Sequence, residues 1–394
     1  MNHHTLRPCV LALALLGFSM PAHGQNPPGF KDLNIGDTAP EFKLTGIDDK
    51  TLSLADFKDA KFLAVVFTSN HCPVSHAAEP RLIKTYQEYK DRGLAVVAIN
   101  PNHPDGLRPD ELGFSKYGDS FAEMKLYAKE EKFPFPFLYD GETQSVAMAY
   151  GCLATPHVFL FDHERKLRYK GWIDDCRFPG DEYVTRPDFR NAVAALVAGQ
   201  PVPVAVTGPI GCSTKWRLKK SEVARDDEKW ASLPVSIDLI DAAGVAKLRA
   251  NASSKYRLIS VWSTTCAPCV EEFPVLVRVA RRMGMRPFEL ITLSTDMPQD
   301  KAKAEEFLRK HHAGLPEHLE DSLANEGRKT NNYLCTDPSA AALIKALDPE
   351  WTGPEPHTIM VAPGGAIAFR HTGKLSEAEL LEKVIAVLTP YYQP

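Results

Sequence analysis

Two cysteines three residues apart, Cys266 and Cys269, stand at the predicted start of a helix. This spacing places one sulfur at the exposed helix tip and the other about one turn further in, close enough for a disulfide. The free N–H groups and the dipole of a helix N-terminus stabilise a thiolate on Cys266. Such a thiolate attacks the disulfide of a partner, and Cys269 then resolves the mixed disulfide. The pair therefore predicts thiol–disulfide exchange.

A zinc site is the alternative interpretation of this spacing, because paired cysteines are also common zinc ligands. Zinc needs four ligands, usually completed by a second cysteine or histidine pair at similar spacing. The sequence offers only the adjacent residues His311 and His312 and the isolated Cys335, which we expect to be structural. We therefore favour redox chemistry at Cys266 and Cys269 and expect neither a metal nor a cofactor.

The frame around this pair occurs twice in the chain. An apolar run over residues 62–67 leads into Cys72, and a run over 256–262 leads into Cys266. Each copy closes on a Pro-His step that begins a further apolar run, at Pro156 and Pro356. A cysteine at a strand-to-helix junction with a distant proline beside it is typical of a thiol-redox site. The repeat therefore predicts two such sites, each with a solvent-reachable sulfur.

Cys72 has no second cysteine nearby, because Ser75 stands three residues later. A single activated thiol forms a sulfenic acid with peroxide or a mixed disulfide with a partner, and then needs a resolving thiol from elsewhere. Any lone cysteine is more often a buried structural residue. The candidate resolving thiols are Cys152, Cys176 and Cys212.

Copper binding near Cys72 is a further alternative, because three histidines could gather there: His71, His76 and His157. Exported copper carriers generally use a second nearby cysteine, which this stretch lacks. We therefore rank copper binding well below redox chemistry.

Strands and helices must position these residues. Short apolar runs predict strands at 62–67, 94–99, 157–161, 167–171, 257–261, 288–293, 358–361 and 367–371. Capping and proline–glycine signals predict helices at 73–92, 120–132, 144–150, 187–199, 266–283, 301–311 and 376–388. Residues 100–118 and the polar stretch after 311 predict surface excursions.

The order of these elements is βαβ followed by ββα in each half. This is the thioredoxin arrangement, an α/β fold with a central mixed sheet flanked by helices on both faces. We expect two such domains, over residues 33–199 and 235–394, joined by a proline-rich linker over 200–234.

Composition and charge exclude some functions. Of 394 residues, 44% are hydrophobic and 24% charged, which is typical of globular proteins. The net charge of −4 gives no electrostatic basis for binding nucleic acid.

The first residues predict export. Arg7, the apolar run over 10–18 and the small-residue end Ala22-His23-Gly24 form a signal-peptide pattern over residues 1–24. The run is shorter than the about 20 apolar residues that span a bilayer, and we expect no membrane span. Disulfides persist in a periplasmic or secreted location.

Residues 261–274, which read VWSTTCAPCVEEFP, resemble the active site of TlpA-like thioredoxin-family oxidoreductases. The resemblance implies that Cys266 is the nucleophile, that Cys269 resolves, and that Pro356 is a cis-proline facing them. Glu355 stands where that family commonly has threonine or a small apolar residue. A carboxylate there would raise the pKa of Cys266, unless it points to water.

The first half resembles the exported, peroxiredoxin-like branch of the AhpC/TSA (redoxin) family. The matching residues are 35–42, 68–73, 133–136, 155–156 and 211–216. The resemblance implies a cis-proline at Pro156. It favours Cys212 as the thiol that resolves Cys72. Cys152, four residues before Pro156, is favoured by its expected proximity, and both rank ahead of Cys176.

The leading hypothesis is an exported thiol–disulfide oxidoreductase of two thioredoxin-fold domains. Its partners would be disulfide-bearing client proteins or a small peroxide, and an upstream thiol reductant. In a second hypothesis the first domain only docks clients for the second. The third is a copper carrier.

Overall fold

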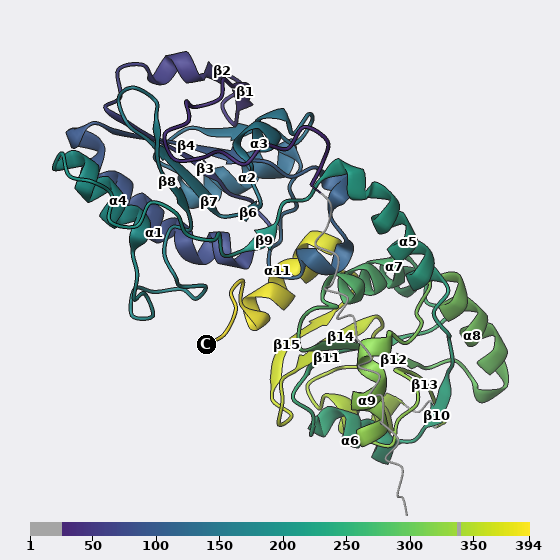
Figure 1. The fold of residues 1–394 in the computed structure, drawn as a ribbon. Helices are drawn as coiled ribbons and strands as arrows, with labels where there is room; N and C mark the ends of the chain where they lie inside the picture. Colours follow the sequence, from purple (N-terminus) through teal and green to yellow (C-terminus); the bar gives the residue numbers. More distant parts are fainter. Residues whose placement is uncertain (1–25, 337–339) are drawn as a thin grey trace, which may run out of the picture.

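The computed structural model describes residues 26–336 and 340–394. The expected signal peptide over 1–24 lies outside these residues. The described chain forms two mixed sheets, each flanked by helices, and the two parts lie side by side with the C-terminal segment between them (Figure 1). No helix in the described ranges has both the length and the apolar character required to cross a bilayer.

The first sheet has seven strands in the order β2-β1-β5-β4-β3-β7-β8. Strands β3, β4 and β5 run parallel, and β7 and β8 form an antiparallel hairpin beside β3. Their bounds are β1 Lys43–Gly46, β2 Thr51–Ser53, β3 Phe62–Phe67, β4 Leu94–Asn100, β5 Phe137–Tyr139, β7 His157–Phe161 and β8 Leu167–Gly171. Because β3 is central, Cys72 follows the carboxyl end of a fully paired strand.

Alternate residues of β3 enter two different cores, as the two-residue period of a strand requires. Ala64 and Val66 pack with helices α1, α2 and α4 on one face of the sheet. Leu63 and Val65 pack with α3 and the N-terminal segment on the other. The helices are α1 Pro73–Tyr89, α2 Phe121–Glu131, α3 Ser145–Tyr150 and α4 Asp188–Val197.

The expected linker over 200–234 requires correction. Residues 212–213 form strand β9, which pairs with β6 (Ala154–Thr155), and Trp216 is buried in the first core. Residues Lys220–Ala231 then form helix α5. Prolines suggested an extended tether, but the Gly-Cys-Ser-Thr-Lys-Trp stretch returns to the first sheet because its backbone and Trp216 find partners there.

The second sheet has six strands in the order β10-β13-β12-β11-β14-β15. Strands β10 to β13 are parallel, and β14 and β15 are antiparallel. Their bounds are β10 Asp238–Ile240, β11 Tyr256–Trp262, β12 Phe288–Ser294, β13 Asn332–Cys335, β14 His357–Val361 and β15 Ile367–Thr372. Central strand β11 leads into Cys266 as β3 leads into Cys72.

Helices cover both faces of the second sheet. Leu258 and Trp262 face α7, α8 and α11, whereas Ile259 and Val261 face α6 and α10. The helices are α6 Ala242–Ala250, α7 Ala267–Arg282, α8 Lys301–Lys310, α9 Glu317–Asn325, α10 Ala340–Leu347 and α11 Glu377–Leu388. The polar stretch after 311 was expected to be an excursion, yet it contains α9, β13 and α10. These elements are short, and α9 buries only Leu319 and Leu323.

The second half packs on the stretch expected to be a surface excursion. Arg282 Nε donates to the carbonyl of Leu112 at 3.0 Å, and Arg286 Nη1 donates to the carbonyl of Gly113 at 2.8 Å. Arg286 also reaches the carbonyl of Thr389 at 2.9 Å, so it ties the C-terminal segment to this contact. Residues 112–115 are therefore part of the contact between the two halves.

Candidate functional site

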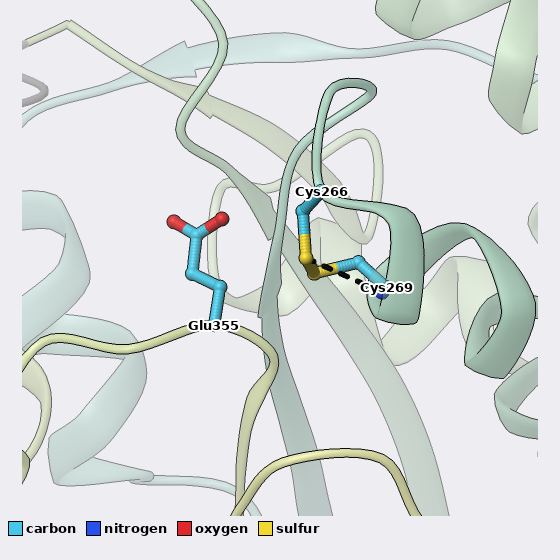
Figure 2. A group of neighbouring side chains, drawn as sticks. All are labelled: Cys266, Cys269 and Glu355. Atoms are coloured by element: carbon cyan, nitrogen blue, oxygen red, sulfur yellow. Dashed lines mark hydrogen bonds between the residues drawn. A yellow bond between two sulfur atoms is a disulfide. The ribbon is translucent and has the colours of Figure 1, made fainter.

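Cys266 and Cys269 form a disulfide at the N-terminus of α7, with an S–S distance of 2.02 Å (Figure 2). Cys266 is the N-cap residue, in extended conformation, and its Sγ accepts the N–H of Cys269 at 3.3 Å. Cys266 is partly exposed, whereas Cys269 is buried among the apolar side chains below it. Solvent therefore reaches the first sulfur and not the second, which suits entry of a partner at Cys266.

Glu355 faces this disulfide from the loop before β14 (Figure 2). One of its oxygens and the two sulfurs all lie within 4.8 Å of one another. Glu355 Oε1 accepts a hydrogen bond from Thr295 Oγ1 at 2.6 Å, which holds the carboxylate in place. The next peptide bond, Glu355–Pro356, is cis, as is Thr155–Pro156 in the first half.

These three side chains are also the one group in the described ranges that could hold a metal ion through three ligands. Two thiolates and a carboxylate suit zinc. Such binding requires the reduced pair, because a disulfide has no thiolate to offer.

A buried carboxyl group lies one turn after Cys269. Glu272 is 1% exposed; its Oε1 accepts the N–H of Leu375 at 2.8 Å, and its Oε2 has no hydrogen-bond partner in the part of the chain that the structure describes. Burial raises its pKa to about 7. A group with this pKa can accept or release a proton at neutral pH. Sequence reasoning missed it, although a glutamate on the apolar face of α7 was the available signal.

Cys72 occupies the equivalent place at the N-terminus of α1, but its side chain is 0% exposed. The expectation of a solvent-reachable sulfur is therefore wrong here. The cause is strand β9, which returns across the helix tip and donates the N–H of Cys212 to Cys72 Sγ at 3.4 Å. Cys72 Sγ also lies 3.1 Å from the carbonyl oxygen of Thr155, the residue before cis Pro156.

The surroundings of Cys72 are polar although buried. Burial by itself would raise the pKa of this thiol, but a hydrogen bond from Cys212, the charge of His71 and two backbone N–H groups hold that pKa well below its usual range. Cys212 is partly exposed, and its pKa is raised, first by its hydrogen bond to Cys72 and then by burial. The contact between the two thiols thus shifts their pKa values in opposite directions.

The other two candidate resolving thiols lie elsewhere. Cys152 is buried and bonds Thr214 Oγ1 at 3.4 Å, and burial raises its pKa to about 12. Cys176 is buried in the loop after β8, where its sulfur accepts the N–H of Phe178. Of the three, the structure places only Cys212 against Cys72.

The histidines around Cys72 do not converge on it as metal ligands. His71 Nδ1 binds Asp119 at 2.6 Å, and His76 Nε2 binds the carbonyl oxygen of Asn70 at 2.7 Å. His157 packs against Phe159 with the two rings tilted by 46°, and burial lowers the pKa of His157 to about 3. The gathering of imidazoles on which copper binding depended is absent from the described residues.

Comparisons with known proteins show which protein families this chain is similar to. Residues 35–170 match the AhpC/TSA family. Thiol-disulfide oxidoreductase ResA of Bacillus thuringiensis subsp. konkukian is 24% identical over 135 residues, which cover 34% of this chain and 68% of that protein. The protein of the same name from Geobacillus thermodenitrificans is 25% identical over 159 residues, covering 40% of this chain and 80% of its own.

This chain is a thioredoxin-fold protein. The thiol-disulfide oxidoreductase relatives support oxidoreductase activity for it. Among solved structures, a hypothetical protein from Sinorhizobium meliloti is 37% identical and covers 47% of this chain and 96% of its own, with a TM-score of 0.42.

Sequence reasoning also missed Asp119, the residue immediately before the predicted helix over 120–132. Ser120 alone caps α2, by accepting the N–H of Glu123. Asp119 is 1% exposed and turns inward to His71. An acidic residue beside a residue that already caps the helix was the only signal available.

Proposed function

We propose that the protein is an exported thiol–disulfide oxidoreductase of two thioredoxin-like domains, whose Cys266–Cys269 pair exchanges disulfides with client proteins. One observation carries the proposal: the pair forms a disulfide at a helix N-terminus, where Cys266 is partly exposed and Cys269 is buried. Export is supported by the signal-peptide pattern over residues 1–24. An upstream thiol reductant would return the pair to the dithiol.

The reaction is a two-step exchange. The Cys266 thiolate attacks one sulfur of the client disulfide, which forms a mixed disulfide and releases the other client sulfur as a thiolate. Cys269 then loses its proton and attacks Cys266, which restores the disulfide seen here and releases the second client thiol. Glu272 is the nearest buried group along α7 with a pKa suited to accept the Cys269 proton.

Trapping tests this function. With Cys269→Ser the mixed disulfide cannot be resolved, so client proteins should accumulate on Cys266 and be released by a reductant. Cys266→Ser is the matched control and should capture none. Equal capture by the two variants, or capture by neither, would refute the assignment.

A second activity is favoured by the burial and low pKa of Cys72. We propose that this thiol reduces a small peroxide rather than a client disulfide, because a residue with no exposed surface excludes a partner as large as a protein. Peroxide turnover should vanish in Cys72→Ser and slow in Cys266→Ser, if the second domain supplies electrons. Turnover that persists in Cys72→Ser would leave the first domain as a docking module.

A further inference from the structure

The contact between Cys72 and Cys212 is built into the fold. Strand β9 pairs with β6 so that Cys212 lies opposite Thr155, and Thr155 carbonyl oxygen is 3.1 Å from Cys72 Sγ. A Cβ at Gly211 would lie 1.8 Å from that same carbonyl oxygen, so only glycine allows this approach. Gly211 therefore allows the backbone to bring Cys212 into contact with Cys72.

A buried carboxyl group is hydrogen-bonded to His71, the residue before Cys72. His71 and Asp119 are joined at 2.6 Å, with side chains 1% and 0% exposed. Asp119 also accepts the Asn70 N–H at 2.8 Å and Asn102 Nδ2 at 2.8 Å. These donors and His71 hold the pKa of Asp119 below its usual range against the opposing effect of burial. Asp119 is thus kept ionised and orients the imidazole.

The second nitrogen of that imidazole makes no contact like the first. His71 Nε2 is buried and has no hydrogen-bond partner among the described residues, and the same is true of Ser75 Oγ on the first turn of α1. Buried polar atoms without partners are costly, and they mark places where a charge or a small polar ligand belongs. A thiolate on Cys72, which lies between these two residues in the sequence, supplies such a charge.

The two sulfurs differ in access and in charge. Cys212 is partly exposed and its pKa is raised, whereas Cys72 is buried and its pKa is lowered. In exchange reactions the attacked sulfur must be reachable, and the thiol of lower pKa is the better leaving group. These requirements divide the roles between the two residues.

We propose that Cys72 and Cys212 form a second redox couple, in which a partner thiol enters at Cys212. Cys72, which follows the hydrogen-bonded pair His71–Asp119, is the leaving and resolving sulfur. The inference rests on the proposed reactivity of Cys72. An incoming thiolate attacks Cys212 Sγ of the Cys72–Cys212 disulfide; the bond to the partner forms, the S–S bond breaks, and Cys72 leaves as a thiolate. A second partner thiol attacks the partner sulfur of the mixed disulfide. Cys212 leaves as a thiolate and takes up a proton. One disulfide is reduced and two partner thiols are oxidised to a disulfide.

Disulfide mapping tests the couple in the full chain carrying Cys266→Ser and Cys269→Ser, so the result is independent of the other site. After oxidation with glutathione disulfide and tryptic digestion, we expect peptide 62–81 linked to peptide 191–215. Cys152 and Cys176 fall on other tryptic peptides. A link from Cys72 to either of them would overturn the proposal, and Cys335→Ser, as a matched control, should not alter the expected link.

Single variants test the order of events. In Cys72→Ser, glutathione should remain as a mixed disulfide on Cys212. In Cys212→Ser, Cys72 should stay free of glutathione, because no exposed sulfur receives the reagent. Glutathione on Cys72 in the second variant, or none on Cys212 in the first, would reverse the assigned roles.

The pH dependence of the thiolate tests the role of His71. Besides His71 and Asp119, the titratable groups facing Cys72 or Cys212 are His76, Glu79, Glu111, Lys215 and Tyr392. Because His71 lowers the pKa of Cys72, removing its imidazole in His71→Asn should raise the midpoint of thiolate absorbance by about one to three pH units.

His163→Asn, an exposed matched control, should leave this midpoint in place. A His71→Asn midpoint equal to that of the control would refute the role of the imidazole. The disulfide mapping keeps Cys72, Cys212 and His71 unchanged, so its result holds even if the His71→Asn variant folds poorly. Failure of the couple leaves client trapping at Cys266 unaffected, so the two proposals fail separately.

Discussion

Replacing Glu355 by glutamine should lower the pKa of Cys266 in the reduced protein. One Glu355 oxygen and both sulfurs lie within 4.8 Å of one another. At that separation two negative charges repel by about 1 kcal/mol with the dielectric constant of water and by about 3.5 kcal/mol with an effective value of about 20. At about 1.4 kcal/mol per pH unit, Glu355 raises the pKa of Cys266 by about 0.6 to 2.5. Because Glu355 and Cys266 are partly exposed, we expect the lower half of this range.

The assay is the rate of Cys266 alkylation by iodoacetamide as a function of pH, read by mass spectrometry in a Cys72→Ser, Cys212→Ser background. Glu355→Gln keeps the size of the side chain and an oxygen for Thr295 Oγ1. Thr295→Val is the matched control, because it removes that hydrogen bond and leaves the charge. A Glu355→Gln midpoint that is unchanged or higher would show that the carboxylate does not act on the thiolate. A lower midpoint also predicts a more oxidising couple.

Three further outcomes are expected. Burial raises the pKa of Glu79 to about 8, so this group should lower the free energy of unfolding by on the order of 3–5 kcal/mol as pH rises from about 4.5 to 8; Glu272 and Asp140 contribute slopes of the same sign, so Glu79→Gln should reduce the difference between urea unfolding at pH 5 and pH 8, and an equal difference in the variant would contradict the assignment. Gly211→Ala should cost about 1–3 kcal/mol in thermal unfolding, because its Cβ meets the Thr155 carbonyl oxygen, and should weaken the Cys72–Cys212 link. Arg286→Met should lower the free energy of unfolding by about 1.5–3 kcal/mol for each charged hydrogen bond that is lost. It should also speed proteolysis near residues 112–115, and unchanged cleavage there would argue against the contact.

Much of the fold near Cys266 could be predicted because its signals are local. The apolar run of β11, the cysteine at the helix start and the capping box of Ser376 and Glu379 each depend on a few neighbouring residues. Strand β3 was equally predictable, and it occupies residues Phe62–Phe67 as expected. Short elements such as β13 and α9 were missed, because four to nine residues with mixed polarity carry little periodic signal.

The surroundings of Cys72 could not be predicted in the same way. Its neighbour Cys212 is 140 residues away in the sequence, and Asp119 lies 48 residues from His71. Contacts between residues so far apart in the chain produce no pattern in the local sequence. The prolines between residues 200 and 210 even suggested a free tether where the chain returns to the first sheet.

The amino-acid order was sufficient to locate both sulfur-bearing helix tips, because a helix start depends on backbone groups that adjacent residues supply. Which sulfur meets solvent, and which meets a second thiol and a buried imidazole, depended on packing. Burial and charge come from segments that meet only after the whole chain has folded, so Cys266 is open to partners and Cys72 is enclosed although their local sequences predict the same site.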